Sequence, residues 1–155
     1  MSAALINEIT VALNSMRETS KVDQSIVNNL DGLANVFKES QEKWLTSKNT
    51  KVSIYFYYAA RNAALVVSRM KERFLSSTTN ENSQMAEESL QVIGLIRELL
   101  DLTQNEKPDE DVIKLSIEKV RQLRTVAADT RLIQAQEKEL EDIDKLLNYL
   151  SKLRR

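Results

Sequence analysis

The sequence predicts an all-α fold, a bundle of five or six helices with a long C-terminal helix. Only two glycines and one proline occur in 155 residues, whereas folds built on β-turns or phosphate-binding loops use glycine freely. Apolar residues also recur at intervals of three and four along most of the chain, which is the spacing of one helix face. We expect a helical bundle domain in residues 1–104. Residues 105–155 should form a long helix or a helical hairpin that packs on the bundle or on a partner.

The composition argues against several kinds of site. The chain contains no cysteine and no histidine, so it lacks thiolate nucleophiles, the commonest metal ligand and the commonest general base. We therefore expect no catalytic residue, no metal and no cofactor, and a protein that is not an enzyme. The formal net charge of -1 gives no global field that favours nucleic acid or membrane. Without an apolar run of about 20 residues or a signal-type N-terminus, we expect a cytoplasmic chain, nuclear if eukaryotic.

Two helices are expected in the first 45 residues. The first should follow Ser2, a good capping residue, and end within residues 16–19. The second should begin at a cap within residues 20–23 and continue to Leu45. The single tryptophan, Trp44, falls near the end of this second helix.

The third helix, over residues 50–76, is expected to be the central one. It carries apolar residues on several sides, and a helix that is apolar most of the way round is usually buried between others. Its front, residues 52–58, is β-branched and aromatic, so propensity alone would also allow a strand. A lone strand has no partner for its backbone hydrogen bonds, and the segment runs without a turn into a helical pattern. We therefore expect helix throughout.

The C-terminal third offers two interpretations. After a fourth helix, Pro108 suits the first position of a helix, and no proline or glycine follows it. The stretch is therefore one long helix, or two helices with a break near residues 127–130. Residues 134–141 are almost wholly polar and are expected to form exposed helix.

Two apolar groups are candidates for contact with a partner protein. Consecutive aromatic residues on a helix point in several directions, and aromatic residues are enriched in interface hot spots; the alternative is that all of them belong to the core or its edge. The last helix shows a heptad seam that could fold back on the bundle or dock on another chain. The candidate interface residues are Trp44, Tyr55, Phe56, Tyr57, Tyr58, Ile133, Leu140, Ile143, Leu147 and Leu150.

A set of basic residues lies in the second half of the central helix. Such residues could contact phosphates or an acidic partner, but usually they pair with acids of their own chain, which is the interpretation we prefer. Direct contact with single-stranded nucleic acid, through these residues and the aromatic ones, is a weaker third interpretation. The set consists of Arg61, Arg69, Lys71 and Arg73.

The order of these features resembles the helical domain of GINS subunits, replication proteins that assemble with the replicative helicase. The resemblance lies in residues 5–9, the Arg-Asn element at residues 61–62, the basic residues 69–73 and the acidic opening at residues 85–91. It extends over roughly residues 3–104. It implies a non-enzymatic scaffold whose central helices bury against sister subunits. Members of that family usually add a small β domain, and nothing in the last third of this chain reads as strands.

The preferred function is therefore a non-enzymatic structural subunit or adaptor of a larger protein assembly, with a GINS-like component of the DNA replication machinery as the particular expectation. Its partners would be proteins in a hetero- or homo-oligomer. The alternative is a self-contained helical regulatory or ligand-sensing module that homodimerises through the C-terminal helix. An obligate subunit should aggregate or melt poorly alone, whereas a self-contained module should melt cooperatively.

Overall fold

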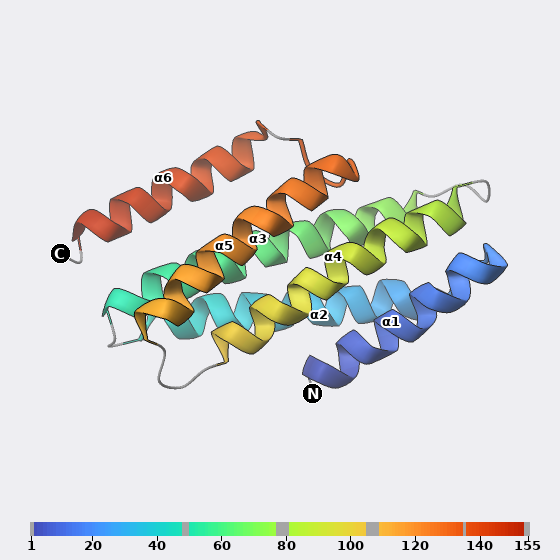
Figure 1. Ribbon diagram of the computed structural model, residues 1–155, viewed down its shortest axis with the longest axis horizontal. Helices are drawn as coiled ribbons and strands as arrows, with labels where there is room; N and C mark the ends of the chain where they lie inside the picture. The colour runs from blue at the N-terminus through green and yellow to red at the C-terminus, as the bar shows by residue number, and fades with distance from the viewer. Residues whose placement is uncertain (1, 48–49, 77–80, 105–108, 135, 154–155) are drawn as a thin grey trace.

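The computed structural model describes residues 2–47, 50–76, 81–104, 109–134 and 136–153. Within these ranges the fold is a bundle of six helices without a strand, so the all-α prediction is confirmed. Successive helices run in alternate directions along the long axis of the molecule (Figure 1). The helices are α1 (Ser2–Thr19), α2 (Gln24–Leu45), α3 (Thr50–Leu75), α4 (Asn82–Thr103), α5 (Glu110–Asp129) and α6 (Lys138–Leu153).

Helix α3 is the central helix, as its apolar sides predict. It packs against α2, α4, α5 and α6, and it is helical from Thr50 onwards, so the strand interpretation of its front is excluded. The small residues Ala59 and Ala63 are buried on it, which lets neighbouring helices approach closely. Its one buried amide side chain, Asn62, donates to the carbonyl oxygen of Tyr58 at 2.9 Å.

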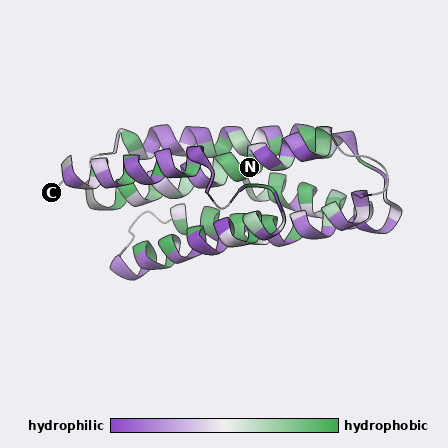
Figure 2. Cartoon of the chain, turned by 90° about the horizontal axis from the view of Figure 1, so that it is seen from above, coloured by the Kyte–Doolittle hydropathy of each residue, from purple (hydrophilic) through white to green (hydrophobic). Residues whose placement is uncertain are grey.

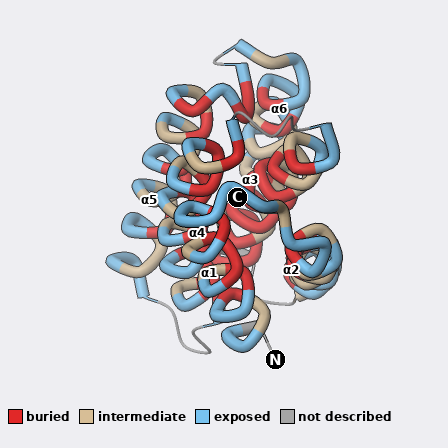
Figure 3. Tube along the Cα trace, turned by 90° about the vertical axis from the view of Figure 1, so that its right-hand side faces the viewer, coloured by how far each residue is buried: buried red, intermediate tan, exposed pale blue. Residues whose placement is uncertain are grey.

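One continuous apolar core joins all six helices. Polar and apolar residues alternate along each helix so that each has a hydrophilic and a hydrophobic side (Figure 2), and the buried positions lie between the helices (Figure 3). Burying a large apolar side chain stabilises the fold by about 1.5–3 kcal/mol before the entropic cost of ordering it. One buried core residue from each helix in chain order is Leu13, Leu30, Met70, Ile96, Leu123 and Leu140.

Two aspartates cap the N-termini of α2 and α5. Asp23 accepts a hydrogen bond from the backbone N–H of Ser25 at 2.9 Å at the start of α2. Asp109 accepts one from the N–H of Val112 at 2.9 Å at the start of α5. Helix α5 therefore begins one residue after the Asp109 cap, and Pro108, which we expected at its first position, lies outside the described residues.

The expectation of one long C-terminal helix is wrong, and the two-helix alternative is right. Helix α5 ends at Asp129 and α6 begins at Lys138, so the described residues 134, 136 and 137 are not the exposed helix that we expected. The chain turns because Arg131 adopts a left-handed φ of 64°. The backbone N–H groups of Leu132 and Ile133 then both donate to the carbonyl oxygen of Ala127, at 2.8 and 3.2 Å. Both side chains are thereby buried in the core.

Helix α6 folds back on its own bundle. Its backbone approaches only that of α3 among the described helices, and it lies at the edge of the molecule in two views (Figures 1 and 3). Helices α5 and α6 therefore form a helical hairpin in which α5 packs on α3 and α4, and α6 packs on α3.

Candidate functional site

Trp44 and Phe56 form a small apolar cluster at one end of the bundle. Their rings meet edge to face, with centroids 4.8 Å apart and an interplanar angle of 74°. Phe56 is fully buried and Trp44 nearly so. Val52 completes the cluster, and residues of α5 pack against it. These two aromatic side chains therefore pack inside the chain's own fold.

Tyr58, Arg124 and Asp144 join three helices. Arg124 donates to both carboxylate oxygens of Asp144, at 2.9 and 3.1 Å. The Tyr58 hydroxyl donates to Asp144 at 3.0 Å and accepts from Arg124 at 2.8 Å. Burial is the main cause that raises the pKa of Tyr58. This arrangement, which we name the Tyr58 clamp, ties α6 to both α3 and α5.

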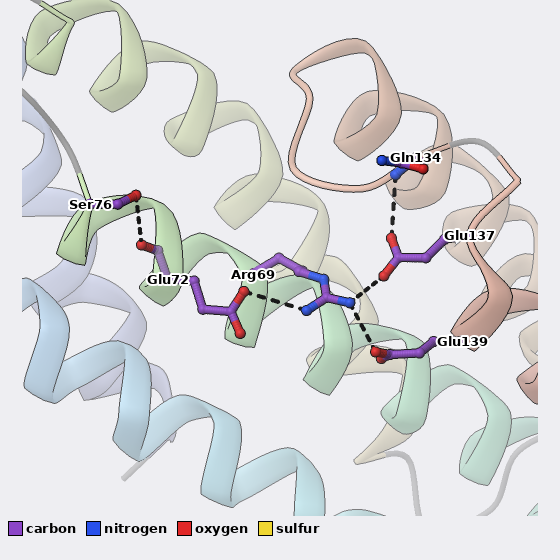
Figure 4. A network of polar contacts seen from close by, with 6 residues as sticks. All are labelled: Arg69, Glu72, Ser76, Gln134, Glu137 and Glu139. Atoms are coloured by element: carbon purple, nitrogen blue, oxygen red, sulfur yellow. Dashed lines mark hydrogen bonds and ion pairs between the residues drawn. The ribbon is translucent and has the colours of Figure 1, made fainter.

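Arg69 binds acids at the beginning of α6. Its guanidinium donates to Glu137, to Glu139 at 2.9 Å and to Glu72 at 3.4 Å (Figure 4). Glu137 also accepts from the backbone N–H of Gln134 at 3.3 Å, which links the turn to the same network. The hydrogen bond to Glu137 is the main cause that raises the pKa of Arg69. Arg69 is thus an anchor for the fold of α6.

Two further members of the predicted basic set are also paired within the chain. Lys71 binds Asp31 of α2 at 2.8 Å. Arg73 binds Glu88 of α4 at 2.8 Å and donates to the carbonyl oxygen of Thr130 at 2.8 Å. Because these cations already contact acids and a carbonyl of their own chain, they link neighbouring elements of the bundle in this conformation.

A polar cavity of about 620 Å³ lies beside Arg73, where α3, α4 and the α5–α6 connection meet. Its lining mixes both signs of charge, since Arg131 and Arg73 stand near Glu88 and Asp129. The two α3 cations in it are already engaged by acids of the chain, since Arg69 binds Glu72 and Arg73 binds Glu88. We therefore do not place the candidate site here.

The candidate site is a groove between α2 and α6 with α3 as its floor, which we name the α2–α6 groove. Its volume is about 340 Å³. Arg61 lies in it half-buried and donates to the hydroxyl of Tyr57 at 3.2 Å. Its other lining residues are Gln41 from α2, Ala64, Leu65 and Ser68 from α3, and Glu139, Asp142 and Ile143 from α6.

An apolar patch adjoins this groove at Arg61 and Ile143. It is formed by Tyr57 of α3 and by Leu146 and Leu147 of α6, among others. All three are half-buried, and Tyr149 on the following turn of α6 is 59% exposed. Beside the groove, these tyrosine and leucine side chains thus keep part of their surface exposed.

The structure divides the predicted interface residues into two groups. Tyr55, Tyr57, Leu147 and Leu150 are half-buried and can be reached from outside. The others are buried within the chain: Trp44, Phe56, Tyr58, Ile133, Leu140 and Ile143. The first part of the heptad seam, Ile133, Leu140 and Ile143, is therefore covered by the chain's own bundle, whereas Leu147 and Leu150 remain partly exposed.

Several residues of the site were not among the sequence candidates. Leu146 and Tyr149 neighbour the predicted seam, and their apolar character next to Leu147 was the signal that could have identified them. Arg124 and Asp144 lie 20 residues apart on different helices, and no local pattern in the sequence links them.

Within the described residues, no group of three or more acidic, histidine or cysteine side chains is placed to hold a metal ion. None of the helices described has a stretch long and apolar enough to cross a membrane. Comparisons of the chain with protein-family models, with curated proteins and with solved structures find no match.

Proposed function

We propose that this protein is a non-enzymatic adaptor or structural subunit that binds a segment of a partner protein in the α2–α6 groove. The observation that supports this proposal is the position of Arg61. It lies half-buried in a groove whose lining includes the apolar residues Ala64, Leu65 and Ile143, and it adjoins half-buried tyrosine and leucine side chains. Tyrosine and arginine are enriched among the residues that dominate binding energy at protein interfaces.

The charges of the groove define the partner segment. The hydrogen bond from Arg61 goes to a neutral hydroxyl, whereas Arg69 and Arg124 bind carboxylates. An incoming carboxylate can form charge-assisted bonds with the guanidinium of Arg61. Glu139 and Asp142 on the α6 wall repel an acidic residue at that side, so they fix the direction in which the segment lies.

The apolar lining defines the rest of the segment. Ala64 and Leu65 form part of the groove lining, and Leu146 and Leu147 extend the apolar surface along α6. An amphipathic helix laid between two helices uses this kind of surface, with anchors one turn apart. The partner segment should therefore carry an acidic residue for Arg61 and at least one large apolar residue for the adjoining patch.

The particular assembly remains the one suggested by sequence resemblance, a GINS-like complex of the replication machinery. The buried polar and apolar contacts of α3 give a rigid scaffold for such a role. Identification of the partner protein would distinguish a GINS-like complex from a different assembly.

Photocrosslinking tests the proposal. A photoreactive amino acid replaces Asp142, which lines the groove and is exposed, and in a control chain it replaces Arg121, which is exposed on α5. Expression in the source cells, irradiation and mass spectrometry then identify the products. We expect one heterologous protein joined at position 142 and absent at position 121. Products that contain only a second copy of this chain would instead favour the self-contained homodimeric module.

A further inference from the structure

The described residues between α5 and α6, 130–134 and 136–137, are non-helical in a stretch whose sequence favours helix. No glycine or proline occurs after Pro108, yet Arg131 takes a left-handed φ of 64°, which costs a residue with a side chain about 1–2 kcal/mol. Val126, Ile133, Leu140 and Leu147 also recur every seven residues across the break. Such a stripe lines one face only if the helix is continuous.

Tertiary contacts hold the break in place. Arg73 donates to the carbonyl oxygen of Thr130, and Arg69 binds Glu137. Leu132 and Ile133 are 6% and 5% exposed. Within a single chain these contacts form while α6 lies back on its own α3, so the turn and the docking of α6 depend on one another.

We propose that the connection converts to helix and that α6 then docks on α3 of a second copy, which returns its own α6 in exchange. Residues 110–153 would form one helix about 66 Å long at 1.5 Å per residue. Exchange of an identical element re-forms the same contacts between chains. The Tyr58 clamp would therefore be made by Tyr58 and Arg124 of one copy and Asp144 of the other.

The balance between the two forms follows from what each buries. Exchange keeps the burial of Leu140 and Ile143 on α3 and removes the left-handed backbone at Arg131. It gives up the burial of Leu132 and the bond from Arg73 to Thr130. We therefore expect a monomer at low concentration and an exchanged dimer at high concentration. The α2–α6 groove is rebuilt in both forms, so this inference does not rest on the proposed partner.

Replacing Arg131 by glycine tests the hinge. Glycine adopts the left-handed conformation without penalty and weakens a continuous helix, so Arg131→Gly should raise the dimer dissociation constant at least about tenfold. Ser20→Gly is the matched control, because Ser20 has a φ of 60° in the α1–α2 connection. It should stabilise the fold without changing dimerisation. Light scattering over a concentration series measures both.

The opposite change should favour exchange. Leu132→Ala removes burial that only the monomer has and improves helix propensity, so it should lower the dimer dissociation constant. Leu140→Ala is its control, since Leu140 is buried in both forms and its loss cannot favour exchange. The pair keeps the inference testable even if the unmodified chain is monomeric at every concentration used.

Spin-label distances identify the arrangement of any dimer. The chain has no cysteine, so Thr125→Cys and Lys145→Cys, at exposed positions next to the Arg124–Asp144 pair, provide two unique labels. Doubly labelled chain is diluted into unlabelled chain. In the hairpin the two labels are close, and on a continuous helix 20 residues of rise separate them by about 30 Å.

We expect the 30 Å distance to appear as the chain dimerises. The fraction of chains with this distance should fall in Arg131→Gly and rise in Leu132→Ala. A dimer that keeps only the short distance would overturn the inference. So would a Leu132→Ala chain that stays monomeric at millimolar concentration.

Discussion

Arg124 of α5 and Asp144 of α6 form a two-bonded ion pair, although the backbones of these two helices do not approach each other. The hydroxyl of Tyr58, which lies on α3, forms hydrogen bonds with both members of this pair. Helix α6 is thus held by its apolar face, which packs on α3, and by a few ion pairs and hydrogen bonds to side chains of α3 and α5. Its position is consequently sensitive to single substitutions.

Asp144→Asn should destabilise the fold by about 1 kcal/mol, or roughly 3 °C in melting temperature. The value lies above that of a surface pair because Arg124 is largely shielded from water, and below that of a buried pair because Asp144 remains accessible. Asp142→Asn, an exposed change on the same helix, should leave the melting temperature unaltered. Equal melting temperatures for both variants would show that the clamp contributes nothing.

Stability should fall in alkaline solution because of Tyr58. Burial raises its pKa above the ordinary 10.0, so the folded state holds the proton more tightly than the unfolded state. The stabilising effect is complete below pH 10 and is lost as the pH rises through the raised pKa of the folded protein. Urea unfolding from pH 8 to 11 measures the slope, and Tyr58→Phe should flatten it. An unchanged slope in that variant would assign the effect to other groups.

The cap at Asp23 should contribute about 1 kcal/mol at neutral pH. Its hydrogen bond from the N–H of Ser25 lowers the pKa of the carboxyl group below 3.8. The contribution is therefore present above pH 3.8 and is lost as the pH falls through the lowered value. Asp23→Ala should cost stability at pH 7 but little at pH 2, whereas Asp23→Asn should retain most of the cap. Chemical denaturation at both pH values checks this; an equal cost at pH 2 would exclude a charge effect.

Phe56 should act as a core residue and not as an interface residue. Phe56→Ala removes a fully buried ring and should cost about 3–5 kcal/mol. Tyr149→Ala, at an exposed position, should change stability by no more than about 0.5 kcal/mol. Thermal and urea denaturation of both variants provides the comparison. A Phe56→Ala chain as stable as the original would contradict the packing described at Trp44.

Local pattern in the sequence was sufficient for most of the fold. The apolar sides of α3 predicted a central helix, and a lone aromatic segment without a pairing strand was correctly taken as helix. The break after Asp129 was not fixed by any local signal, because residues 130–137 contain neither glycine nor proline. It depends on the burial of Leu132 and Ile133 and on the contacts of Arg69 and Arg73, which involve residues more than 50 positions away.

The candidate site was predicted only in part, for the same reason. Tyr57 and Arg61 are one turn apart, so their proximity follows from helix geometry. Whether an aromatic residue of this run is buried depends on which helix covers it: Phe56 meets Trp44, and Tyr58 meets Arg124 and Asp144. The groove exists because α6 returns to α3, and the sequence left that return open.

The affinity of the crosslinked partner for this chain and for its Arg61→Ala variant tests the account most directly. Isothermal titration of purified proteins would compare the unmodified chain, Arg61→Ala in the groove and Arg121→Ala on the exposed side of α5. We predict that Arg61→Ala weakens binding by about tenfold or more, with an unchanged melting temperature, and that Arg121→Ala has no effect. Equal affinities for all three chains would contradict the assignment of the α2–α6 groove as the partner-binding site.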